Sequence, residues 1–121
     1  MKIAIVPGHT LTGKGTRAVG YIDEGKENRI LTDLIVKWLK QRGASVYTDK
    51  IDNSNNYLSE QYQIANKQDV DLAVQIHFNA NSITLNTMGT ETLYIKQIMR
   101  KYMLKELIQS YQLYLKIEAL K

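Results

Sequence analysis

The sequence contains no cysteine, one proline, one phenylalanine and two histidines among its 121 residues. Without cysteine, the chain can form neither a disulfide framework nor a thiolate metal site. No apolar stretch approaches the ~20 residues that a transmembrane helix needs, so no membrane-spanning segment is expected. The apolar run that follows Met1 is also too short for the core of a signal peptide. The sequence therefore predicts a protein that is made in the cytoplasm.

Charge of one sign is not concentrated in any segment. The formal net charge is +4, and charged residues make up 23% of the chain. No basic run is dense enough to indicate nucleic-acid binding. The excess of positive charge permits attraction to an anionic polymer, although a solvated basic surface is the simpler explanation. Hydrophobic residues at 44% are ordinary for one globular domain.

One histidine follows directly on the first predicted strand. Residues 2–6 have the composition of a buried strand, and Gly8 after them permits a sharp turn. His9 is therefore expected to project from a rigid strand end over a glycine-rich loop. The loop leads to a helical pattern whose start holds three possible carboxylate ligands, which are Asp23, Glu24 and Glu27.

The other histidine occupies an equivalent position. Residues 71–76 form a second strand pattern, and His77 follows it. A single histidine after a strand is usually a polar residue at a sheet edge. Because the carboxyl ends of parallel strands line one crevice, however, His9 and His77 are expected to meet there. Two histidines and one carboxylate with an open fourth position are the ligand set of a catalytic zinc.

Short motifs along the first 95 residues carry a family resemblance. In chain order they are Val6-Pro7-Gly8-His9, Glu24 with Asn28 and Leu31, Leu58, Ile64-Ala65-Asn66, Asp71, Ile76-His77-Phe78-Asn79-Ala80 and Gly89-Thr90-Glu91-Thr92-Leu93-Tyr94. Together they resemble the zinc-dependent N-acetylmuramoyl-L-alanine amidases, the cell-wall amidases of sporulation and of phage endolysins. The resemblance implies that His9, Glu24 and His77 bind zinc. It selects Glu24 over Glu27 because the spacing to Asn28 fits the family pattern.

Hydrophobic periodicity predicts a three-layer α/β domain with a mostly parallel sheet of about four strands and flanking helices. A core-packing helix is expected over residues 24–42, with Gly43 as its C-cap. Further elements are a strand at 44–48, a helix at 57–68 and a fourth strand at 90–95. The apolar positions expected to face the core in the first helix are Ile30, Leu31, Leu34, Ile35, Trp38 and Leu39. The family usually has arginine where this chain has Gln61, which leaves one polar contact in question.

The resemblance stops near residue 95. The family continues to a strand that ends in a catalytic glutamate, whereas residues 96–121 show helical spacing and contain only two acids, Glu106 and Glu118. When this segment is back-translated with A/T-rich codons and the DNA is read from the third base of the Lys96 codon, the resulting amino-acid sequence is similar to the family's next helix. We therefore expect residues 1–95 to be the N-terminal part of the amidase catalytic domain and 96–121 to be a helical, frame-shifted tail. No catalytic acid or base is identified.

The resemblance implies a peptidoglycan hydrolase that cleaves the amide between N-acetylmuramic acid and L-alanine with zinc-activated water. It would act on the cell wall, as a prophage endolysin does, and the lost glutamate would impair its activity. One alternative is a non-catalytic, zinc-holding remnant that binds the wall. Another is a phosphate-binding protein, because residues 8–14 satisfy all but the last position of the G-x-x-x-x-G-K-[ST] pattern. The expected helix begins near Glu24 rather than at Lys14, which disfavours a phosphate site.

Overall fold

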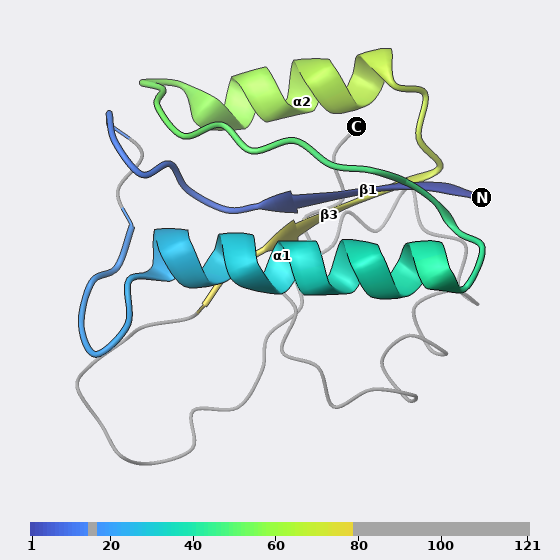
Figure 1. Ribbon diagram of the computed structural model, residues 1–121. Coiled ribbons are helices and arrows are strands. Elements are labelled where there is room, and N and C mark those ends of the chain that lie inside the picture. Colours follow the sequence, from blue (N-terminus) through green and yellow to red (C-terminus); the bar gives the residue numbers. More distant parts are fainter. Residues whose placement is uncertain (15–16, 79–121) are drawn as a thin grey trace.

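The computed structural model describes residues 1–14 and 17–78 of the chain. These residues form a three-stranded parallel sheet and two helices (Figure 1). In chain order the elements are β1 (Lys2–Pro7), α1 (Glu24–Gln41), β2 (Ser45–Tyr47), α2 (Tyr57–Lys67) and β3 (Leu72–Ile76). The predicted α/β class is confirmed, and each element end up to residue 76 lies within one residue of its expected place. The strand predicted at 90–95 and the helical tail at 96–121 lie outside the described residues.

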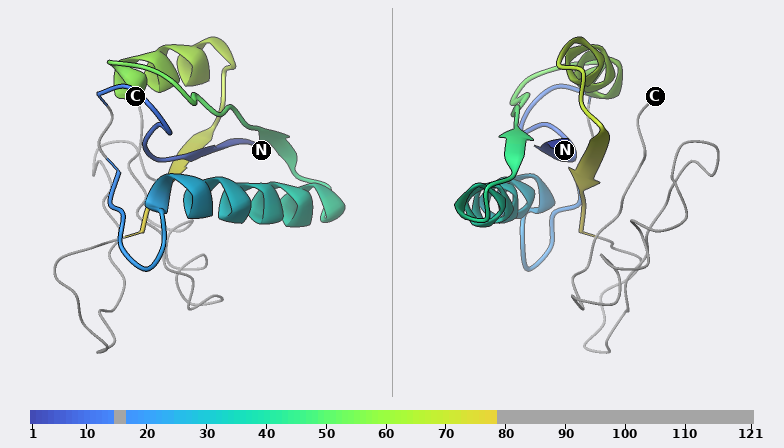
Figure 2. Two further views of the ribbon diagram at one scale, coloured as in Figure 1. Left: turned by 60° about the vertical axis from the view of Figure 1, so that its left-hand side comes forward. Right: turned by 90° about the vertical axis from the view of Figure 1, so that its right-hand side faces the viewer.

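The strands lie in the order β2-β1-β3, so β1 is central in the described sheet. Helix α1 connects β1 to β2, and α2 lies in the connection from β2 to β3. Figure 2 shows the two helices on opposite faces of the sheet, which gives the expected three layers.

The two faces of the sheet carry different cores, because neighbouring residues of a strand point to opposite sides. The face toward α1 holds large aliphatic side chains, namely Ile3, Ile5, Val36, Val74 and Ile76. The other face holds the small Ala4 and Ala73, against which Tyr62 of α2 packs. The α1 face therefore buries mainly large aliphatic side chains, whereas Ala4 and Ala73 leave room for Tyr62 on the α2 face.

Three of the six α1 residues that were predicted to face the core are exposed instead. Ile30 is 55% exposed, Leu34 59% and Trp38 36%. Trp38 is thus not a core residue, and the Arg42 guanidinium lies 3.1 Å from its ring centroid. Three of the predicted residues do pack against the core, namely Leu31, Ile35 and Leu39. The buried face of the helix also includes polar residues, in a row four apart that consists of Glu24, Asn28 and Thr32 and continues to Val36.

The pairing of β1 with β3 brings two distant chain segments to one edge of the sheet. Pro7 at the end of β1 pairs with Ile76 at the end of β3. Because the two strands are parallel, the residues that follow them leave the sheet side by side. Within the described part of the chain, neither helix is long and apolar enough to cross a membrane.

Candidate metal centre

His9 lies two residues beyond β1 in an uncommon backbone conformation. Its φ angle is +58°, in the left-handed region, where histidine occurs more often than most residues with a side chain. Two side chains of α1 hold the backbone on either side of this bend. Asn28 Nδ2 donates to the carbonyl oxygen of Gly8 at 3.2 Å, and Arg29 Nη2 donates to that of His9 at 3.3 Å. Helix α1 therefore fixes the direction in which the His9 ring leaves the sheet.

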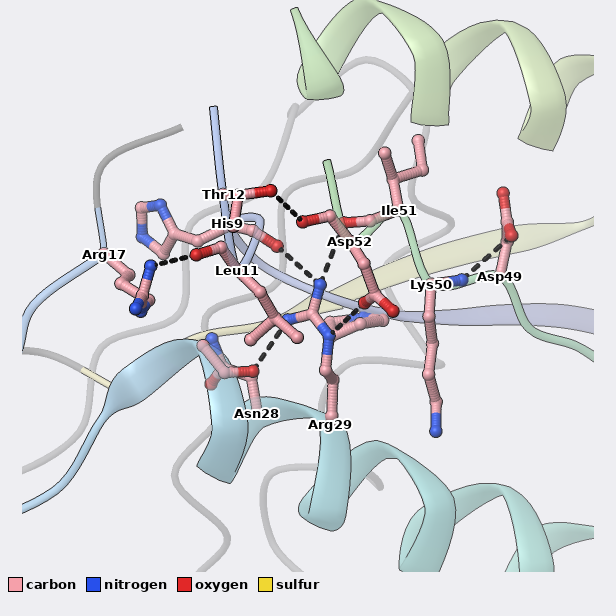
Figure 3. Close-up of polar contacts among 12 residues, drawn as sticks. His9, Leu11, Thr12, Arg17, Asn28, Arg29, Asp49, Lys50, Ile51 and Asp52 are labelled. Carbon is pink, nitrogen blue, oxygen red and sulfur yellow. Dashed lines mark hydrogen bonds and ion pairs between the residues drawn. The ribbon is translucent and has the colours of Figure 1, made fainter. Parts of the chain in front are cut away.

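Arg29 ties this bend to the segment that precedes α2 (Figure 3). Its guanidinium donates to Asp52 Oδ1 and to the carbonyl oxygen of Ile51, both at 2.8 Å, and to that of Gly25 at 2.6 Å. The planar fork of arginine suits such a set of divergent acceptors. Since Arg29 is 9% exposed, this network takes the place of water around a buried charge.

His77 follows β3 directly and packs its ring against Gly8. A Cβ atom added to Gly8 would lie 2.2 Å from His77 Cε1 and 2.5 Å from each ring nitrogen. The absence of a side chain at Gly8 therefore makes room for the His77 ring. The backbone joins the two segments as well, because Gly8 N donates to the carbonyl oxygen of Ile76 at 2.7 Å. The sequence indicated only a turn at Gly8, whereas the structure adds this close approach.

Glu24, the first residue of α1, contacts both histidine rings. Its Oε2 is 3.4 Å from His9 Nε2, and its Oε1 is 3.3 Å from His77 Nδ1. One ligand atom from each of the three residues lies within 4.8 Å of the others. The rings meet edge to face with their centroids 4.7 Å apart. The structure thus brings together the three residues that the sequence selected.

The surroundings of Glu24 favour its ionised form. Burial opposes ionisation, but hydrogen bonds with His77 and His9 and from the backbone amide of Ala18, together with attraction to His9, outweigh it and hold the pKa of Glu24 well below its usual range. Phe78 N also donates to the carboxylate, at 3.1 Å. The carboxylate is therefore charged at neutral pH and can bind a cation without first losing a proton.

The donor set fits a zinc ion. Two imidazoles and one carboxylate leave a fourth position free, as in catalytic zinc sites. A histidine that binds metal usually offers its second ring nitrogen to an oxygen. Here His9 Nδ1 lies 3.5 Å from the hydroxyl of Tyr57, and His77 Nε2 lies 3.0 Å from Gln75 Oε1. Both rings therefore have the outer support that such sites show.

The other acids near the start of α1 have separate places. Asp23 is the N-cap, and its Oδ1 accepts from Gly25 N at 3.0 Å and from Arg17 Nε at 2.8 Å. Glu27 lies in the first turn of α1, outside the group that could hold a metal. In the described residues that group consists of His9, Glu24 and His77 alone.

The loop that matches the phosphate-binding pattern uses its backbone amides elsewhere. Leu11 N and Thr12 N both donate to the carbonyl oxygen of Asp52, at 2.9 and 3.0 Å. Lys14 N donates to Asn55 Oδ1 at 3.1 Å. Helix α1 begins at Glu24 and not at Lys14, whereas the phosphate-binding pattern needs its own helix to start at the lysine. These contacts oppose a phosphate cradle.

Sequence reasoning missed Arg29, Tyr57 and Gln75. Gln75 carried a usable signal, because it is a polar residue in an otherwise apolar strand and shares a strand face with His77. Arg29 and Tyr57 carried none, because a cation on a helix and an aromatic residue at a helix start are common features. Their roles depend on how α1 and α2 lie against the loops.

Comparison with known proteins gives one match. The family model for N-acetylmuramoyl-L-alanine amidase matches residues 3–118, a range that runs from within β1 past β3 and covers much of the segment after residue 95. The boundary predicted at residue 95 and the frame-shifted tail stay predictions. No curated protein and no solved structure gives a significant match. Since the family match covers nearly the whole chain, this protein belongs to the N-acetylmuramoyl-L-alanine amidase family, whose members act on cell-wall peptidoglycan.

Proposed function

We propose that this protein is a zinc-dependent peptidoglycan amidase that hydrolyses the bond between N-acetylmuramic acid and L-alanine. Its family supports an amidase that acts on peptidoglycan. The observation that carries the zinc proposal is the convergence of His9, Glu24 and His77 within 4.8 Å at the carboxyl edge of the sheet, where α/β folds bind ligands.

In this proposal the nitrogens that face Glu24, His9 Nε2 and His77 Nδ1, hold the ion together with the Glu24 carboxylate. When bound, zinc supplies a Lewis acid that polarises the substrate carbonyl and lowers the pKa of water to ~7. The His9 side chain is 22% exposed and that of His77 10%. The centre is therefore more open to substrate on the His9 side.

The hydrolysis adds the oxygen of water to the carbonyl carbon and breaks the carbon–nitrogen bond. The amine of L-alanine must then receive a proton. The resemblance gives this step to a glutamate that the sequence predicts to be lost from this chain. General acid–base help is typically worth ~10²–10⁴-fold in rate, so we expect slow turnover if no residue after 78 replaces that glutamate.

The test combines metal analysis with wall hydrolysis by the purified 121-residue chain. We expect about one zinc per chain in the native protein and none in His77→Ala, because that change removes one of three ligands. Incubation with purified peptidoglycan should slowly release peptides with a free L-alanine amine, detected by mass spectrometry. A chelator should stop the release, and added zinc should restore it.

The possible outcomes separate the candidate functions. Zinc without peptide release, even at high protein concentration, would favour the non-catalytic wall-binding alternative. A native protein that takes up no zinc would refute the proposal. Micromolar ATP affinity that Lys14→Ala removes would instead support the phosphate-binding alternative, which the contacts of the loop oppose.

A further inference from the structure

Two buried glutamines connect the His77 ring to the end of β1. His77 Nε2 lies 3.0 Å from Gln75 Oε1, and Gln75 Nε2 donates to Gln61 Oε1 at 2.6 Å. Gln61 Nε2 in turn donates to the carbonyl oxygen of Pro7 at 2.9 Å. Gln61 is 3% exposed and Gln75 1%, so these amides depend on one another and not on water. We call this chain of hydrogen bonds the glutamine relay.

The Pro7 carbonyl, at one end of the relay, fixes the direction of all its hydrogen bonds. The Pro7 carbonyl can only accept, so Gln61 must present its NH₂ group there and its oxygen to Gln75. Gln75 must then present its own NH₂ group to Gln61 and its oxygen to His77. An amide oxygen requires a donor, so the His77 nitrogen that it faces must carry hydrogen. This deduction depends on the Pro7 carbonyl and not on how either amide group was oriented.

We propose that Gln61 and Gln75 are positioning residues that keep hydrogen on Nε2 of His77, so that the Nδ1 lone pair becomes available when a metal displaces the hydrogen bond to Glu24. Nδ1 is the nitrogen that lies 3.3 Å from Glu24 Oε1, on the side of the candidate metal centre. The inference rests on the proposed zinc site, because it is a metal that needs this lone pair. Neither glutamine belongs to the group that could hold the metal.

The relay opposes a preference of the site itself. A carboxylate only accepts hydrogen bonds, so Glu24 alone would draw the ring hydrogen of His77 to Nδ1 and block the metal-facing nitrogen. The contact of His9 with Tyr57 does not set a direction in the same way, since a hydroxyl can both donate and accept. Of the two histidines, only His77 therefore has its tautomer set by a hydrogen bond from outside the metal centre.

The relay also explains why the residue at position 61 matters. Arginine has donors and no acceptor. In place of Gln61 it would donate both to the Pro7 carbonyl and to Gln75 Oε1. Gln75 would then turn its NH₂ group toward His77, which would require a bare Nε2 and place the ring hydrogen on Nδ1. Glutamine at 61 and glutamine at 75 are thus a matched pair.

The experiment compares three variants of the full chain. Gln61→Arg reverses the relay. Gln63→Arg makes the same change two residues along α2, where the side chain is exposed, and serves as the matched control. The double variant Gln61→Arg with Gln75→Glu restores the direction at His77, because a carboxylate accepts both from the guanidinium and from His77 Nε2. Zinc affinity is measured by competition with a chromophoric chelator, and the ring nitrogens by NMR of protein labelled with ¹⁵N in histidine.

We expect Gln61→Arg to weaken zinc binding by ~10–100-fold, the usual loss when an outer partner of a metal ligand is removed. The Nε2–H signal of His77 should disappear in this variant. The double variant should recover the signal and most of the affinity. Gln63→Arg should stay within about twofold of the native protein, as surface changes usually do.

Unchanged zinc affinity and an intact Nε2–H signal in Gln61→Arg would overturn the relay. So would a folded double variant that is no better than the single one. Failure of the zinc site is distinguishable from failure of the relay. A native chain that binds no zinc but carries the hydrogen on Nε2 would leave the relay standing, whereas a native chain that binds zinc without this hydrogen would refute the relay alone.

Discussion

Adding a single methyl group at Gly8 should disable the metal centre while the chain still folds. In Gly8→Ala the new Cβ would lie 2.2 Å from His77 Cε1, whereas carbon atoms in contact are about 3.5 Å apart. The ring must therefore retreat by about 1.3 Å. Metal–ligand distances vary by only about 0.2 Å, so a displaced ring can no longer act as a ligand with the other two residues.

We expect Gly8→Ala to lose at least ~100-fold in zinc affinity, equivalent to about 2.8 kcal/mol. The metal-free variant should still fold, because the atoms in the way belong to a side chain and not to the backbone, although loss of the His77–Gln75 hydrogen bond should lower its melting temperature. The rise in melting temperature that zinc gives the native chain should shrink accordingly. Chelator competition measures the affinity, and thermal unfolding with and without zinc measures the stability.

Gly20→Ala is the matched control for this change. A Cβ at Gly20 would meet no atom within 4 Å, so this variant should bind zinc as the native chain does. Native zinc affinity in a folded Gly8→Ala would refute the reasoning, because it would show that His77 is not needed at its observed place.

Two further variants test the residues that hold Glu24 and His9 in place. Asp23→Ala removes the cap of α1 and should lower the free energy of unfolding by about 1 kcal/mol in urea titrations; Asp23→Asn keeps a capping oxygen, so equal losses in the two variants would contradict a capping role. Arg29→Lys keeps the charge but loses the fork, and it should cost at least about 2 kcal/mol and weaken zinc binding through His9. The control Arg42→Lys lies at the exposed C-cap of α1, where the guanidinium stacks on Trp38, and should cost at most about 1 kcal/mol; a loss at Arg29 no larger than this would show that its buried contacts contribute little.

The sequence predicted the location of the candidate site well because that location depends on topology. Two apolar runs, each followed by a histidine, are enough to place His9 and His77 at one edge once the strands pair in parallel, as Pro7 and Ile76 do. The carboxylate was harder to assign. Three acids stand at the start of α1, and spacing alone left all of them open. Family resemblance selected Glu24, and the structure shows the physical difference, since the Asp23 carboxylate is occupied as the helix cap.

The inner face of α1 could not be predicted from hydrophobic periodicity, because that face is polar where it approaches the site. Glu24, Asn28 and Thr32 are buried at successive turns, and a search for apolar residues assigns such positions to the solvent side. The same search therefore placed Trp38 in the core, although it is 36% exposed. A periodicity argument fails first in helices whose buried face is polar for reasons of function.

The close packing of α2 against the sheet affects the tautomer of His77. Gln61 reaches both the Pro7 carbonyl and Gln75, at 2.9 and 2.6 Å, and such short distances require α2 to lie close to β1 and β3. Ala4 and Ala73 permit this approach, because they are small buried residues of the sheet on the side where α2 packs. A larger side chain at either alanine would lift α2 and lengthen the relay, since packed interiors do not absorb added volume without movement. The size of two core residues therefore bears on which nitrogen of His77 is available to a metal.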